Sequence, residues 1–139
     1  MVRNFIAIIS GILSCVLMIF AIEIIGNSIK PMPVDIYDHE AFENYIHNEA
    51  PKSFYLLILF AYFVGSFTGA FVTSIISTNK KMLRAMTVGG ITMGWGLFTL
   101  TTLQYPSWII ICALFIFLPA AYFGSVLSKQ FFQKKQLTQ

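Results

Sequence analysis

The chain has 139 residues, of which 57% are hydrophobic and only 11% are charged, and its mean hydropathy is +0.75. Soluble domains have about 45–50% apolar and about 25% charged residues, so this composition excludes an ordinary soluble domain and indicates a membrane protein. The formal net charge of +3 comes from bases beside the apolar runs rather than from one dense patch, and no nucleic acid is expected as a partner.

Four long apolar runs make up most of the chain. Each is about as long as a helix needs to cross a hydrocarbon core of about 30 Å, and lipid offers a non-helical backbone no hydrogen-bond partners. The predicted spans are Phe5–Ile25, Ser53–Ile76, Leu83–Leu103 and Ser107–Leu127. The sequence therefore predicts an all-α membrane protein, in which residues 1–139 form a single transmembrane domain built as an up-down bundle of four helices.

The first run follows Arg3, and a cleaved signal peptide is the alternative interpretation. Its apolar stretch exceeds the about 7–15 residues of a signal's central region, so we expect a retained span. Cys15 in this run and Cys112 in the last one lie among apolar residues. A thiol in such surroundings packs as a small apolar side chain, and a role in packing is expected for both.

The loop between the first two spans, residues 27–52, is long for a connection between helices, which usually takes about 2–8 residues. Pro31 and Pro33 hold its start extended, and an aspartate can then cap a helix. Apolar residues recur at helical spacing at Ala41, Phe42, Tyr45, Ile46 and Ala50. We expect a short amphipathic helix that lies on the outer membrane surface or covers the end of the bundle.

The acids outside the spans and most of the bases lie at opposite ends of the predicted spans. The bases outside the first loop are Arg3, Lys80, Lys81, Arg84, Lys129, Lys134 and Lys135. The acids outside the spans, Asp35, Asp38, Glu40, Glu43 and Glu49, all lie in the first loop. Because basic residues concentrate on the cytoplasmic side of membrane proteins, we predict that both termini are cytoplasmic and that the acidic loop is extracytoplasmic.

Small residues at four-residue spacing supply surfaces on which helices can pack closely in a membrane. The predicted packing positions are Gly65 and Gly69, Gly90 and Gly94, and Ala120 and Gly124. The simpler interpretation is that they form the seams between the helices of the bundle, whose other faces contact lipid. The alternative is that they bind a second copy of the chain or a larger membrane complex.

Glu23 is the one formally charged residue inside a predicted span. It lies eight residues from the centre of that span near Cys15, about 12 Å along a helix, just inside the outer boundary of the hydrocarbon. In one interpretation it is structural and bonds to the loop or to Asn27, four residues on. In the other it is an ion-coupling carboxylate in an outward-facing vestibule.

No catalytic residue, metal site or cofactor is expected. His39, Glu43 and His47 follow one another at four-residue spacing, but the two histidines are about 12 Å apart along a helix and cannot share a metal ion. A neighbouring pair would supply half a metal site at most. The sequence has no nucleophile with a partnered base and no phosphate-binding loop, so an enzyme is not predicted.

Three stretches carry a resemblance to a known family. Glu23–Asn27 with Lys30–Asp35, Ala61–Val72 and Leu118–Gly124 resemble a family of small bacterial four-span integral membrane proteins, which have a glutamate and a glycine at the end of the first span. The resemblance implies the four-span fold and the bacterial inner membrane, but no particular activity. The family often has a histidine where this chain has Asn27, so no metal or proton role is carried over to that position.

Two functions remain open from the sequence. The first is a non-enzymatic accessory subunit or scaffold in the membrane. The alternative is a small proton- or cation-coupled transporter that uses Glu23 as its coupling carboxylate. In size the chain resembles small multidrug-resistance exporters, but their glutamate lies deep within the first span and their loops are short.

Overall fold

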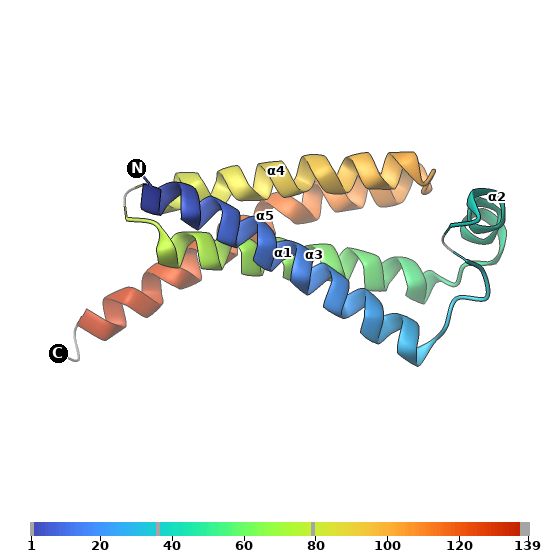
Figure 1. Cartoon of the computed structure of the whole chain (residues 1–139), viewed down its shortest axis with the longest axis horizontal. Helices are drawn as coiled ribbons and strands as arrows, with labels where there is room; N and C mark the ends of the chain where they lie inside the picture. Colours follow the sequence, from blue (N-terminus) through green and yellow to red (C-terminus); the bar gives the residue numbers. More distant parts are fainter. Residues whose placement is uncertain (1, 36, 79, 137–139) are drawn as a thin grey trace.

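The computed structural model describes residues 2–35, 37–78 and 80–136, with side chains as far as Phe131. This part of the chain is all-helical and contains no strand. Its elements are α1 (Val2–Ile29), α2 (His39–Asn44), the π-helical turn η1 (Tyr45–Glu49), α3 (Lys52–Ile76), α4 (Lys81–Thr102) and α5 (Ser107–Gln136), arranged as in Figure 1.

Three of the long helices are long and apolar enough to cross a membrane: α1, α3 and the Ser107–Phe131 part of α5. They coincide with three of the four predicted spans. The remaining predicted span, Leu83–Leu103, forms α4, whose 22 residues include five threonines and four glycines as well as Lys81 and Arg84. These residues lower its hydropathy below that of the other three helices, so composition supports three membrane-crossing helices.

α3 lies at the centre of the bundle and packs against α1, α4 and α5, while α4 also packs against α5. α1 packs mainly on α3 and has only a small contact with α4. The start of α1, the α3–α4 joint and the end of α5 lie at one end of the molecule, and α2 lies at the other (Figure 1). We call these the terminal end and the α2 end.

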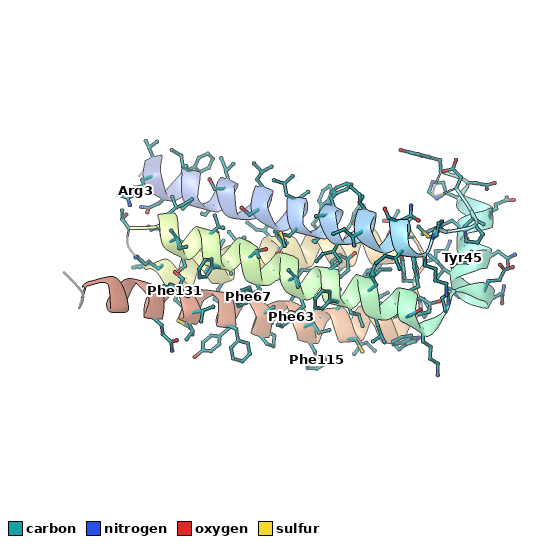
Figure 2. The ribbon with its side chains drawn as sticks, turned by 90° about the horizontal axis from the view of Figure 1, so that it is seen from below. Arg3, Tyr45, Phe63, Phe67, Phe115 and Phe131 are labelled. Atoms are coloured by element: carbon teal, nitrogen blue, oxygen red, sulfur yellow. The ribbon has the colours of Figure 1, made fainter. Side chains whose placement is uncertain are left out.

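The outward faces of the bundle are apolar, as expected of helices surrounded by lipid. Figure 2 shows Arg3 and Tyr45 at opposite ends and a set of phenylalanines along the side of the bundle between them. Phe63, Phe115 and Phe131 are all exposed. Phe63 and Phe67 stack with their ring centroids 6.5 Å apart.

Glycines form the seam between α1 and α3. A Cβ on Gly65 would lie 2.6 Å from Ile19, and one on Gly69 would lie 2.8 Å from the carbonyl oxygen of Gly11. Both distances are too short for a real side chain, so the two backbones approach each other as closely as they do only because Cβ atoms are absent. Cys15 is fully buried in the same seam.

α5 packs so closely on α3 at Gly124 that a Cβ at this position would collide with the backbone of Phe67. Ala120, one turn earlier in α5, is fully buried.

In α4 the packing glycines differ from the expected pair. Gly90 and Gly94 have open space where a Cβ would be, whereas Gly89 abuts Ala121 and Gly96 abuts Phe117. The expected spacing is present, but the face of α4 that carries Gly90 and Gly94 points away from the bundle.

Side-chain hydrogen bonds tie the first turn of α1 to the α3–α4 joint. The Asn4 side-chain oxygen accepts hydrogen bonds from the Thr78 hydroxyl, at 2.9 Å, and from the Arg84 guanidinium. The Thr78 backbone N–H also donates to it, at 3.3 Å. Arg3 Nε donates to the carbonyl oxygen of Ile76 at 3.2 Å. The terminal end of the bundle is therefore fastened by polar contacts.

The segment α2–η1 covers the other end of the bundle. Asp38 caps α2, with its carboxylate accepting from the Ala41 N–H at 3.3 Å. Phe42 and Ile46 are buried in the same apolar cluster as Tyr105 and the start of α3. The Tyr55 hydroxyl donates to the carbonyl oxygen of Ile46 and holds η1 against α3.

Candidate functional site

A cavity of about 510 Å³ lies at the α2 end, bounded by α1, the start of α3, the end of α4 and the segments on either side of α2. This volume is within the range of about 300–1,000 Å³ that is usual for small-molecule sites. Its polar side chains are Glu23, Asn27, Lys30, Tyr45, Ser53, Tyr62, Thr99 and Tyr105, and most of the remaining wall is apolar.

The cavity exists because α1 diverges from α4 toward the α2 end (Figure 1). At the terminal end the glycines of α1 and α3 bring these helices into close contact. Further along α1, Ile19 packs on Gly65 of α3, and Phe20 and Ile24 line the cavity. Gly26 abuts Leu57 and keeps α1 in contact with α3 beside the cavity.

Glu23 projects from α1 at this cavity, and its side chain is exposed. It makes no hydrogen bond or ion pair with any residue that the structure describes. The contact with Asn27 that one interpretation of the sequence predicts is absent, and the side-chain oxygen of Asn27 accepts instead from the backbone N–H of Met32 at 3.0 Å. Asn27 therefore fixes the path of the chain as it leaves α1, and the Glu23 carboxylate remains available to a ligand.

Two tyrosines from other segments lie near Glu23. Tyr62 of α3 and Tyr105, in the joint between α4 and α5, are buried and close enough for the Glu23 charge to act on both. Burial, with a smaller contribution from neighbouring charges, raises the pKa of the Tyr105 phenol above its usual value. A phenol is protonated at neutral pH in any case, and Tyr105 lines the cavity, so its hydroxyl is available there as a hydrogen-bond donor.

Aromatic rings line much of the rest of the cavity. Phe42 and Tyr105 meet edge to face with their centroids 6.4 Å apart, and Tyr45 and Phe54 do so at 6.1 Å. These pairs come from α2, η1, the start of α3 and the α4–α5 joint, and they join the segment over the α2 end to the bundle. Phe20 of α1 completes the aromatic lining.

A second depression lies on the surface of α2 and η1, between Glu40, Glu43, Asn44, His47 and Asn48. It is shallow and carries acidic and amide side chains. Within the described residues, no three histidine, cysteine or acidic side chains lie close enough to hold a metal ion. The half-site that Glu43 and a neighbouring histidine could at most supply has no third ligand among the described residues.

Sequence reasoning singled out Glu23 and Asn27 but not the aromatic residues around Glu23. Tyr62 and Tyr105 are 39 and 82 residues further along the chain, and no local pattern connects them with α1. Comparison with protein-family models, curated proteins and solved structures gave no match, so function has to be inferred from the site itself.

Proposed function

We propose that this chain is a four-span protein of the bacterial inner membrane that binds a ligand in the Glu23 cavity, as the outward-facing site of a small proton- or cation-coupled transporter. The length and packing of α4 support its assignment as the fourth span. It has 22 residues, about 33 Å at 1.5 Å per residue, and packs along α3 and α5. That length matches the hydrocarbon core.

The threonines of α4 are compatible with a lipid environment. The hydroxyls of Thr87, Thr99 and Thr101 each donate to the carbonyl oxygen four residues earlier, at 2.9, 3.0 and 2.9 Å. A hydroxyl that is satisfied within its own helix costs little in hydrocarbon. The low hydropathy of α4 therefore overstates its polarity, which supports a membrane-crossing role.

The charges support an orientation with the terminal end in the cytoplasm. Arg3, Lys81 and Arg84 lie at the terminal end, and the acids of residues 35–49 lie at the α2 end. Basic residues favour the cytoplasmic side, so the cavity would face the extracytoplasmic side. The prediction for Lys134 and Lys135 concerns side chains outside the part of the chain that the structure describes.

The single observation that carries the functional proposal is the unpaired carboxylate of Glu23 in a cavity. An ionisable residue inside a membrane span is costly unless it is paired or serves a site, and it marks a functional position by default. A purely structural Glu23 would be held by the loop or by Asn27. The closed seam around Gly11 and Gly69 lies toward the terminal end, so ligand would enter from the α2 end.

Cysteine accessibility tests this proposal. In a Cys15→Ala, Cys112→Ala background, Glu23→Cys should react with a membrane-impermeant maleimide added outside intact cells. Leu17→Cys, on the outward face of the same helix and closer to the bilayer centre, is the matched control and should not react. An unreactive Glu23→Cys in a folded protein would contradict a water-accessible outward site.

A second candidate function is the accessory subunit or scaffold. The observation that favours it is the outward glycine pair Gly90 and Gly94, which could admit the backbone of another helix. Native mass spectrometry in mild detergent tests it. A defined complex or oligomer that is lost in Gly94→Leu would support this function, and a monomer in both proteins would count against it.

A further inference from the structure

We infer that the ligand of the Glu23 cavity is a hydrophobic organic cation, of the class of quaternary ammonium or phosphonium ions that carry aryl or alkyl groups. This inference rests on the proposed function, which requires a ligand in the cavity but does not state its charge. It is carried by the combination of one unpaired acid with aromatic walls.

The charge of the ligand is inferred from Glu23. Glu23 is the only acidic residue among the described residues that line the cavity. A carboxylate in a largely apolar cavity that has no protein partner lacks a counter-charge, and a bound cation would provide one. A neutral or anionic ligand would leave Glu23 uncompensated or would repel it.

The aromatic walls favour a cation that has little bound water. The faces of Phe, Tyr and Trp rings attract cations, most strongly where water is excluded. Phe54, Tyr62 and Tyr105 bring such rings to the cavity from α3 and from the α4–α5 joint, and Phe20 brings one from α1.

The same walls argue against a divalent metal ion. Calcium requires six to eight oxygen ligands and magnesium requires an octahedral set, whereas Glu23 is the single carboxylate in this lining. An organic cation needs no such ligand set, because its charge is spread over a larger volume and its substituents fill apolar space.

Lys30 is the one base among the described lining residues, and it has to be reconciled with a cationic ligand. It follows Glu23 by seven residues and lies just past the end of α1 at Ile29, and its side chain is exposed at the α2 end. A lysine there can extend its ammonium group into water. The acids of residues 35–49 outnumber the bases at this end and would raise the local concentration of cations.

The experiment compares three probes of similar shape but different charge: tetraphenylphosphonium, tetraphenylborate and neutral triphenylphosphine oxide. Binding to the full chain in nanodiscs of zwitterionic lipid is measured by equilibrium dialysis, and uptake by empty nanodiscs is subtracted. We expect tetraphenylphosphonium to bind at least about ten-fold more tightly than the neutral probe, a difference of about 1.4 kcal/mol.

Two substitutions assign the binding to Glu23. Glu23→Gln should weaken tetraphenylphosphonium binding by about ten-fold or more and leave the neutral probe nearly unchanged. Glu40→Gln removes the same charge from the exposed surface of α2 and serves as the matched control, with an effect of less than about two-fold. Circular dichroism and thermal unfolding confirm that each variant is folded.

The outcomes separate this inference from the proposed function. If all three probes bind alike, and all are lost when Thr99→Trp fills the cavity while Glu23→Gln has no effect, the cavity binds ligands but the inference of a cation is wrong. Preferential binding of tetraphenylborate that depends on Lys30 would also overturn it. If no probe binds above empty nanodiscs, both the cation and the ligand-binding function fail.

Discussion

Gly11 in α1 lies directly against Thr73 in α3, so closely that a Cβ on Gly11 would collide with the Thr73 hydroxyl. That hydroxyl donates to the carbonyl oxygen of Gly69 at 2.8 Å and is thereby satisfied within its own helix. The contact closes the interface of α1 and α3 toward the terminal end, while α1 diverges from α4 toward the other end. The cavity lies at the end of the bundle where α1 and α4 have separated.

Gly11→Val should destabilise the bundle, because the new side chain would have to displace Thr73 or separate α1 from α3. Forcing extra methyl groups into a packed interface costs about 1–3 kcal/mol, and we expect a lower midpoint of thermal unfolding in detergent. Gly94→Ala is the matched control, because a Cβ there meets open space. Equal midpoints for Gly11→Val and the parent protein would show that this seam is not closely packed.

Asn4→Ala should loosen the terminal end of the bundle, because one side-chain oxygen accepts from both Thr78 and Arg84. Removing the acceptor of such a network costs about 1–3 kcal/mol where the donors are not rehydrated, and less at an exposed end. Hydrogen exchange followed by mass spectrometry should show faster exchange in the first turns of α1. Asn48→Ala, at an exposed position in η1, is the control and should leave α1 unchanged.

The sequence predicted the all-helical class and three of the apolar helices well, because lipid leaves a long apolar run no other regular structure. It predicted helix ends less well. α1 continues to Ile29, four residues past the predicted end, since Asn27 and Ser28 tolerate a helical end in which Ser28 Oγ donates to the carbonyl oxygen of Ile24. Hydropathy alone cannot detect this continuation into polar sequence.

The packing glycines show a different limit of the sequence. Four-residue spacing marks one face of a helix but does not say which face meets a neighbour. Gly65 and Gly69 lie in a seam, whereas Gly90 and Gly94 face away from the bundle. Gly11 also lies in such a pattern, four residues after Ala7 and four before Cys15, but it was not among the predicted packing positions. Likewise, the sequence predicts how far Glu23 lies along the first span. It does not predict the tyrosines near Glu23, because they come from distant segments.

Tyr55→Phe should free the segment α2–η1 from the bundle, because the Tyr55 hydroxyl is the described side-chain donor to the carbonyl oxygen of Ile46. Leaving that buried acceptor without its partner costs about 1–3 kcal/mol. Amides of residues 42–50 should exchange faster, while those of the helices should not. Tyr37→Phe, at a position that is 92% exposed, should have no such effect. Unchanged exchange in Tyr55→Phe would mean that apolar contacts alone hold η1.

Tyr105→Phe should make the protein less sensitive to alkaline pH. Burial raises the pKa of the Tyr105 phenol, whose ordinary value is 10.0, so the folded state keeps this proton at a pH where the unfolded chain releases it. The stability that the protonated group contributes is therefore complete below about pH 10 and falls as pH rises toward the folded-state pKa. The parent protein should lose more of its unfolding midpoint than Tyr105→Phe between about pH 9 and about pH 11. Tyr37→Phe should behave like the parent protein. If Tyr105→Phe does too, ionisation of the Tyr105 phenol contributes little to the alkaline destabilisation.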